Sequence, residues 1–389
     1  MKRVCIIRHK CYPIAVPTRR NAEALVSRGY EVDIICLRGK GEKSREVIRG
    51  VNVYRLPVEH RRGGVARYVS EYAAFFLLAF FKLTWLSLRR RYQVVEVDNM
   101  PDFLVFTALV PKLMGAKIII QILDHSPEVF MDGFGVGSKH PVVRTLRILE
   151  KASAGWSDHV IVTQDTSLEL LKRLGIPQAK MSVLLNVPDE DIFTSGAPVS
   201  DNGHFRLMTH GSIVDRYGLS TLIKAVPLLK ETIPDLQVEI VGDGESRQRL
   251  EALAKSLGVG EMIRFTGRIP MDEVPAHIAR ADVGVVVIPW GNNPAVPNKL
   301  FEYAALGKPA IVTSIEPIKS YFDDDAVMYY EPGSEQDLAR CILELYRNPE
   351  KRASLALNCS AVYQKCRWSL MKEEYYKVFD RLLGAYSLS

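Results

Sequence analysis

The sequence has little cysteine and no long apolar run. Its six cysteines lack Cys-x-x-Cys spacing and zinc-finger histidines, so we expect reduced thiols, mostly in the core, in a cytosolic protein. The N-terminal MKRVCIIRHK loses its apolar character at Arg8, too early for the hydrophobic region of a signal peptide. The most apolar segment, 72–81, is about half as long as the roughly 20 residues of a membrane span, so we expect no span there.

Compositional bias is also absent. Apolar residues make up 47% of the 389 residues and charged residues 25%, as in ordinary globular proteins, which excludes disordered and collagen-like classes. The length suits two or three domains.

Charge, in contrast, is unevenly distributed. Residues 1–91 contain 20 Lys and Arg against 7 Asp and Glu, and the remainder contains 31 Lys and Arg against 38 Asp and Glu. The basic first quarter would attract anionic lipids or phosphorylated molecules, and an ordinary solvated basic surface explains it equally well.

Short β-branched runs alternate with helical patterns through most of the chain. They begin near residues 4, 32, 51, 94, 117, 159 and 180, and again near 205, 236, 262, 282, 309 and 326. This alternation is typical of parallel sheets buried on both faces. The stretch 187–203 loses it and collects Pro, Gly, Ser and Asp, as linkers do. We therefore predict two doubly wound α/β domains, 1–190 and 204–366, and a C-terminal helix, 367–389, that returns to the first domain.

The segment 294–312, PAVPNKLFEYAALGKPAIV, carries the densest group of reactive side chains. Pro297 suits the first turn of a helix, which places Asn298, Lys299 and the preceding amides at its positive end, where phosphate binds. Lys299 and Glu302 share one helix face, as a cation for a diphosphate and a carboxylate for ribose hydroxyls would. A surface Lys–Glu pair explains the same spacing.

This segment resembles the donor-binding signature of the retaining family-4 glycosyltransferases of GT-B fold, in the variant typical of bacterial surface-polysaccharide enzymes. Further segments are similar to the strand and loop motifs of that family: HGSIVDRYGLSTLIKAV from His210, VEIVGDGESRQRLEALA from Val238 and RFTGRIP from Arg264. The N-terminal half is similar more loosely. The resemblance implies two Rossmann-like domains that face each other across a cleft, the first binding the acceptor and the second the nucleotide sugar.

The same resemblance implies the activity: transfer of a hexose-type sugar from a nucleoside diphosphate sugar to a hydroxyl of a glycan or lipid-linked acceptor, with retention of configuration. Matched residue by residue, the catalytic candidates are Arg216, Lys299, His125 and Asp124. The donor-binding candidates are Gly211, Ser212, Asp243, Arg268, Ile269, Val296, Asn298 and Glu302. The acceptor-binding candidates are Tyr12, Arg19, Asn99 and Glu128.

Departures from the family pattern limit this transfer of roles. The first of two characteristic glutamates falls at Pro294, so the sugar is not readable from the sequence. Arg216 is the only cation left in its loop, and an exposed loop arginine is the alternative explanation. Leu123 replaces a characteristic histidine; His125 is the candidate substitute, and a histidine that is merely hydrogen-bonded in a loop is an equally good interpretation.

Cations and helix-end amides can stabilise a departing diphosphate without a metal, so we expect no metal and no cofactor. The acidic triplet 323–325 is interpreted as a solvated turn. The segment 65–91 combines an apolar body with the cluster Arg89, Arg90 and Arg91, and Arg61 and Arg62 flank its start, as in an interfacial helix on an anionic membrane. A buried core helix explains its apolar residues equally well. A cytoplasmic protein at the inner face of the cell membrane follows, with no nucleic-acid partner.

Three other functions compete with transfer. A nucleotide-sugar epimerase would share the two-domain fold but would need no acceptor. A non-catalytic sugar-nucleotide sensor or scaffold is conceivable because the first glutamate is missing. A dinucleotide-dependent oxidoreductase is excluded, because no G-x-G-x-x-G follows the first apolar run at residues 4–7.

Overall fold

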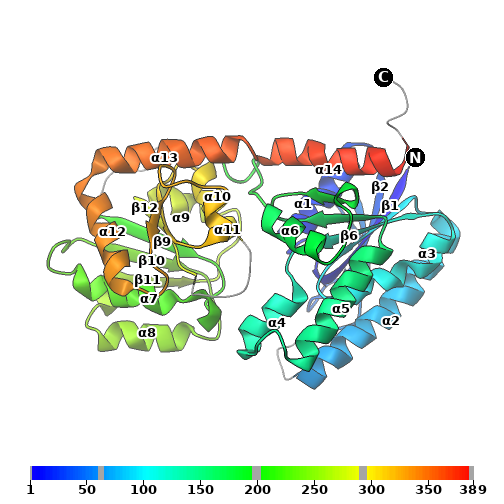
Figure 1. The fold of residues 1–389 in the computed structure, drawn as a ribbon, viewed down its shortest axis with the longest axis horizontal. Helices are drawn as coiled ribbons and strands as arrows, with labels where there is room; N and C mark the ends of the chain where they lie inside the picture. Colours follow the sequence, from blue (N-terminus) through cyan, green and yellow to red (C-terminus); the bar gives the residue numbers. More distant parts are fainter. Residues whose placement is uncertain (1, 60–64, 195–202, 289–295, 385–389) are drawn as a thin grey trace. The chain divides into compact units, whose positions relative to one another are not determined.

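The computed structural model describes residues 2–59, 65–194, 203–288 and 296–384. The chain divides into two compact units, Met1–Asn186 together with Met371–Ser389, and Val187–Leu370. Each unit is built on one sheet with helices between its strands (Figure 1).

The sheet of the first unit has the order β3-β4-β2-β1-β5-β6-β7-β8. Its strands are β1 (Arg3–Cys11), β2 (Glu31–Leu37), β3 (Arg45–Ile48), β4 (Val51–Leu56), β5 (Val94–Asp98), β6 (Lys117–Ile122), β7 (His159–Val162) and β8 (Met181–Val183). All neighbours are parallel except β3 and β4, and Ile6 of β1 aligns with Ile34 of β2 and Glu96 of β5. The apolar runs of the sequence did not predict β3, because it is a short, largely exposed edge strand without such a run.

Helices cover both faces of this sheet. They are α1 (Val16–Ser27), α2 (Val65–Arg90), α3 (Leu109–Leu113), α4 (Ser126–Phe134), α5 (Pro141–Trp156), α6 (Asp165–Arg173) and α14 (Trp368–Leu382), with the 3-10 helix η1 (Asp102–Ala108). Phe75, Ala79 and Leu83 of α2 pack into one core with Val95 and Val97 of β5. The intervening residue of β5, Glu96, faces the opposite side, because side chains alternate along a strand.

On that opposite side, α14 returns to the first unit. The hydroxyl of Tyr375 donates to Oε2 of Glu96 at 2.6 Å, and that of Tyr376 donates to the carbonyl of Ala24 in α1 at 2.7 Å. Arg28 forms an ion pair with Asp380 at 2.7 Å. The last part of the chain therefore completes the first unit.

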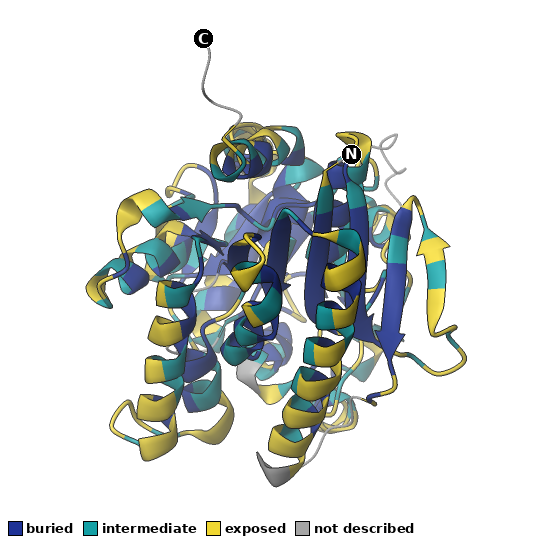
Figure 2. Cartoon of the chain, turned by 90° about the vertical axis from the view of Figure 1, so that its right-hand side faces the viewer, coloured by how far each residue is buried: buried dark blue, intermediate teal, exposed yellow. Residues whose placement is uncertain are grey.

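Helix α2 is longer than its most apolar run. By length and composition, the segment Arg67–Arg90 is long and apolar enough to cross a membrane, although only 28% of its most apolar window is buried. The ten-residue run was therefore too narrow a basis for excluding a span. In Figure 2, one side of α2 packs on the buried strands, while its outward turns are exposed.

The sheet of the second unit has the order β11-β10-β9-β12-β13-β14 and is parallel throughout. Its strands are β9 (Arg206–His210), β10 (Gln237–Val241), β11 (Ile263–Gly267), β12 (Val283–Val286), β13 (Ala310–Thr313) and β14 (Met328–Tyr330). Its helices are α7 (Leu219–Ala225), α8 (Arg247–Ser256), α9 (Val274–Arg280), α10 (Asn298–Ala305), α11 (Glu316–Lys319), α12 (Glu335–Arg347) and α13 (Pro349–Gln364). This is the Rossmann strand order, which confirms the predicted fold class. The six cysteines are free, five buried and Cys11 half-buried.

Candidate functional site

A small pocket lies at the carboxyl ends of β9 and β10, next to the point where the strand order of the second sheet reverses. Ligands of open α/β sheets bind at such a point. The pocket is lined by Thr209, His210, Gly211, Ser212, Tyr217, Leu219, Ile240, Val241 and Lys299. Three predicted residues, Gly211, Ser212 and Lys299, therefore meet in one place.

Close approach of two loops shapes the pocket wall. Gly211 follows β9 and Gly242 follows β10, and a Cβ atom on Gly242 would lie 1.9 Å from the carbonyl oxygen of Gly211. Gly242 also has a φ of 140°, which side chains rarely adopt. Only glycine at 242 lets the β10 loop pack against the backbone of Gly211.

Helix α10 brings the charged side chains to this wall. It begins at Asn298, and Pro297 is its N-cap. The proline therefore lies one position before the first turn of the helix, in which it was predicted. Its Tyr303 is fully buried, and a Cβ atom on Gly284 of β12 would lie 2.4 Å from the Tyr303 ring. The missing side chain at 284 therefore lets α10 settle on the sheet, which fixes where Lys299 and Glu302 project.

Lys299 reaches the first pocket loop. Its Nζ lies 3.5 Å from Oγ1 of Thr209 and would lie 3.7 Å from a Cβ atom on Gly211. Burial lowers the pKa of Lys299 to about 8, although the charge of Glu302 opposes this shift. A half-buried ammonium group so close to the Gly211 backbone favours binding of an anion.

Glu302 does not pair with Lys299 among the described residues. Its Oε2 instead contacts Nε2 of His210, the last residue of β9, and both side chains are about 90% buried. Nδ1 of His210 lies 3.3 Å from the hydroxyl of Tyr303, which in turn donates to the carbonyl of Met208 at 3.1 Å. The alternative of an exposed Lys–Glu pair on α10 is therefore wrong.

The other donor-binding candidates lie on neighbouring loops. Asp243 follows β10 and is exposed, and Arg268 and Ile269 follow β11. Val296 is buried, and Asn298 is exposed at the start of α10. Arg216 lies in the turn Asp215–Tyr217, with its side chain outside the described part of the structure, and Pro294 is also outside the described residues.

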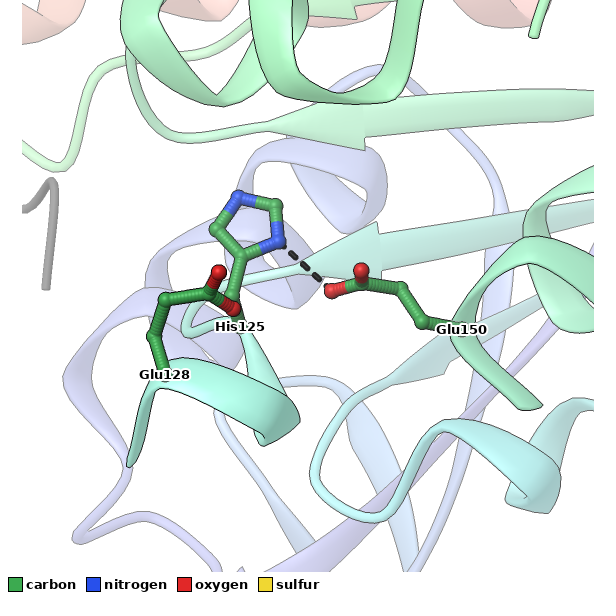
Figure 3. Close-up of side chains that lie close together, drawn as sticks. All are labelled: His125, Glu128 and Glu150. Atoms are coloured by element: carbon green, nitrogen blue, oxygen red, sulfur yellow. Dashed lines mark hydrogen bonds and ion pairs between the residues drawn. The ribbon is translucent and has the colours of Figure 1, made fainter. Parts of the chain in front are cut away.

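In the first unit, His125 belongs to a buried charged cluster (Figure 3). It precedes α4, is 1% exposed, and its Nδ1 lies 2.6 Å from Oε1 of Glu150 on α5. Figure 3 shows its other ring nitrogen turned away from both Glu150 and Glu128. Burial lowers the pKa of His125, but the hydrogen bond and charge of Glu150, with Glu128 and Asp102, raise it overall. Asp102 itself has a pKa raised to about 6, by burial and by Glu150.

Arg147 balances the charge of this cluster. It pairs with Glu128 and lies 3.1 Å from Oε2 of Glu150. Ligand atoms of His125, Glu128 and Glu150 lie within 4.8 Å of one another, close enough to hold a metal ion. Because Arg147 already occupies both carboxylates, we describe the cluster as an ion-pair network.

Among the remaining candidates of the first unit, Asn99 and Glu128 have side-chain partners within the unit. The side chain of Asn99 is 1% exposed, donates to Asp102 and to the carbonyl of Asp124, and accepts from the amide of Leu123 at 2.8 Å. Asn99 thereby fixes the loop in which Asp124 is exposed. Tyr12 is buried, and Arg19 lies 3.9 Å from Glu23. The structure explains Asn99 and Glu128 by packing within the unit.

Two family models match the chain, one in each unit. Residues 14–186 match the glycosyl transferase 4-like domain, and residues 195–359 match glycosyl transferases group 1. The chain is therefore a glycosyltransferase, with a glycosyl transferase 4-like domain in the first unit and a group 1 domain in the second. The pocket of this glycosyltransferase, lined in part by Gly211 and Lys299, lies within the region that the group 1 model matches.

Similar proteins agree with this assignment. An uncharacterized glycosyltransferase of Methanocaldococcus jannaschii is 25% identical over 95% of both chains. A GDP-mannose-dependent α-(1-6)-phosphatidylinositol monomannoside mannosyltransferase of Mycolicibacterium smegmatis is 45% identical over 71 residues, which cover 18% of this glycosyltransferase and 19% of that enzyme. The solved sucrose-phosphate synthase of Thermosynechococcus elongatus superimposes with a TM-score of 0.79 at 18% identity, covering 99% and 100% of the two chains. The fold is GT-B.

Sequence reasoning missed two residues of this glycosyltransferase. His210 was noted only as the start of a motif, although a histidine at a strand end directly before a pocket glycine was a usable signal. Glu150 lies within a helical pattern, and nothing in its spacing from His125 indicates that the two side chains meet.

Proposed function

We propose that this glycosyltransferase moves a hexose-type sugar from a nucleoside diphosphate sugar to a hydroxyl of a lipid-linked or glycan acceptor, with retention of configuration, in surface polysaccharide synthesis. The observation that carries the proposal is the pocket of the second unit, where the half-buried Lys299 amine stands beside the backbone of Gly211. The mannosyltransferase relative, by its name, uses GDP-mannose and a phosphatidylinositol mannoside, which supports both the donor and the acceptor class.

The chemistry follows from the charge that develops on the leaving group. As the bond between the anomeric carbon and the diphosphate breaks, negative charge grows on the diphosphate oxygens. Lys299 and the amides at the start of α10 stabilise that charge, with Arg216 as the proposed second cation. The acceptor oxygen bonds to the anomeric carbon from the same face and gives its proton to the departing phosphate. These groups supply the positive charge without a metal.

We assign the acceptor to the first unit and place that unit on an anionic membrane surface. The support is the outward side of α2, which exposes Leu77, Leu78, Phe81, Trp85 and Leu88 at helical spacing. Arg89 lies over the Trp85 ring at 3.9 Å and is itself exposed. Arg90 instead pairs with Glu31 and Asp33 and belongs to the fold. An apolar stripe with basic side chains beside it fits a helix that lies in the headgroup region at the inner face of the cell membrane.

A ligand panel followed by a transfer assay tests the proposed function. Sugars activated with uridine, guanosine and adenosine diphosphate are screened by thermal shift, and a ligand at about 100 times its Kd should add about 2.7 kcal/mol to the free energy of unfolding. The selected donor is then incubated with lipid-linked acceptors, and the anomeric configuration of the product is read by NMR. Binding without transfer to any acceptor would favour a sensor, and epimerised donor would favour an epimerase.

A further inference from the structure

The contact between His210 and Glu302 joins the end of β9 to the donor helix α10. Glu302 carries a flexible carboxylate, because the terminal torsion of a glutamate is soft and its rotamers interconvert easily. In this structure that carboxylate is held through one oxygen, Oε2, by the ring of His210. Its other oxygen, Oε1, accepts no hydrogen bond from the described residues, so no protein group competes there with a ligand.

His210 is in turn held by Tyr303 of α10. Its Nδ1 lies 3.3 Å from the hydroxyl of Tyr303, and the ring planes of the two residues meet edge to face at 83°. Burial raises the pKa of Tyr303 well above its usual value, so its hydroxyl stays protonated and donates to the carbonyl of Met208. Nε2 then donates to the Glu302 carboxylate, and Nδ1 stays next to the Tyr303 oxygen.

The connection runs through groups that have little freedom. The carbonyl of Met208 belongs to the backbone of β9, and Tyr303 is fully buried. The side chains of His210 and Glu302 are 10% and 11% exposed. His210 also lines the pocket that Lys299 and Gly211 line. His210 therefore determines the orientation of the Glu302 carboxylate, next to the place where we expect the diphosphate.

We propose that His210 is a positioning residue that holds Glu302 in the orientation in which its free oxygen accepts a ribose hydroxyl of the donor nucleotide. This inference rests on the proposed donor site. It predicts that recognition of the ribose hydroxyl depends on His210, a residue that need not touch the ribose itself. A carboxylate fixed at one oxygen discriminates between ribose and deoxyribose more strongly than a mobile one, because less rotamer freedom is lost on binding.

The test compares nucleotides with and without the 2′-hydroxyl. Isothermal titration gives the Kd of UDP and GDP and of their 2′-deoxy counterparts for the wild-type protein, His210→Phe and His210→Gln. We expect the wild type to prefer the ribonucleotide about tenfold, and His210→Phe to reduce the preference to about twofold with little change for the deoxynucleotide. His210→Gln should restore much of the preference, because its amide can donate to Glu302 from nearly the same position as Nε2.

The pair formed by His277 and Glu239 provides a matched control. Nδ1 of His277 on α9 lies 2.9 Å from Oε2 of Glu239 on β10, in the same unit but not in the pocket lining. His277→Phe should keep the full ribose preference. Thermal unfolding of all variants shows whether His210→Phe remains folded, and His210→Gln provides a second measurement if it does not.

The outcomes separate the inference from the proposed function. A full ribose preference in a folded His210→Phe, or equal weakening of ribo- and deoxynucleotides, would overturn the positioning role while leaving the donor site in place. Absence of ribose preference in the wild type would overturn it as well. If neither diphosphate binds the wild type while transfer is also missing, the proposed function itself fails.

Discussion

Each unit contains a histidine hydrogen-bonded to a glutamate, but the two pairs have different surroundings. The pair formed by His125 and Glu150 is sealed in the first unit, with Arg147 and Glu128 completing its charges. The pair formed by His210 and Glu302 borders the pocket of the second unit, beside Lys299. The same two residue types therefore stabilise the fold in one place and, in our proposal, prepare a ligand contact in the other. The accessibility of each pair and the charges next to it decide which of the two roles the pair has.

The largest expected effect comes from breaking the sealed pair. Glu150→Ala leaves the imidazole of His125 buried without its partner and should lower the free energy of unfolding by about 3 kcal/mol, measured by urea denaturation. Glu302→Ala should cost about 1 kcal/mol or less, because the side chains of His210 and Glu302 are less completely buried than those of His125 and Glu150. Equal losses would show that the two pairs do not differ as described.

The pH dependence of this loss has a definite sign. The pKa of His125 is raised above its usual 6.5, so the pairing energy is fully present below about pH 6.5 and declines as the pH rises through the raised value. The difference between the wild type and Glu150→Ala should therefore be larger at pH 6 than at pH 9. A difference that grows with pH would contradict the pairing.

Lys299→Ala should have the largest effect on catalysis. The charge that Lys299 stabilises grows towards the transition state, so we expect kcat to fall about 100-fold, with a higher KM for the donor. Steady-state kinetics with the selected donor measures both. Lys255→Ala, which removes an exposed lysine at the end of α8, serves as the control and should behave as the wild type.

Glu302→Gln should separate binding from turnover. The glutamine oxygen can still accept from His210, but it offers a weaker, uncharged acceptor to the ribose. We expect the KM for the donor to rise about tenfold with kcat within about threefold of the wild type. A fall in kcat equal to that of Lys299→Ala would indicate that Glu302 acts on the reacting bond.

Donor affinity should fall at alkaline pH. The pKa of Lys299 is about 8 in the unliganded protein, so the cation that receives the diphosphate is lost as the pH rises above that value. Titration of UDP or GDP should show a Kd about tenfold higher at pH 9 than at pH 7. Lys299→Arg keeps its charge throughout this range and should flatten the dependence. A steep dependence in Lys299→Arg would place the titrating group elsewhere.

The smallest effects concern the membrane. Arg89→Glu and Phe81→Ser each alter the outward side of α2 and should weaken sedimentation with anionic vesicles severalfold, since one well-placed basic residue contributes about 1 kcal/mol. Leu357→Ser, an equally exposed apolar position on α13, should have no effect. Equal binding of the wild type to neutral and anionic vesicles would remove the electrostatic part of the proposal.

The sequence predicted the sheets better than the site. Runs such as those beginning at Val4 and Val238 identify buried strands because burial on both faces demands uninterrupted β-branched residues. The strand Arg45–Ile48 was not predicted, because an exposed edge strand needs no such run. The start of α4, Ser-Pro-Glu, suits a turn as well as a helix, so the sequence does not distinguish the two.

Within the site, Lys299 and Glu302 were found because they share a helix and its spacing. The partner of Glu302 was not found, since His210 is 92 positions away and only the order of the strands brings the two together. For the same reason, the pairing of Glu150 with His125 could not be read from the chain.

The return of α14 has a consequence for biosynthesis. Residues 371–382 leave the ribosome only after the whole second unit has been translated, so Glu96 and the Ala24 carbonyl lack Tyr375 and Tyr376 until then. The first unit, although translated first, is therefore the last to be completed. A chaperone that protects nascent chains would bind the face of the first sheet that α14 later covers. A nonsense mutation near residue 371 would remove α14 and so destabilise the first unit, which is encoded at the other end of the gene.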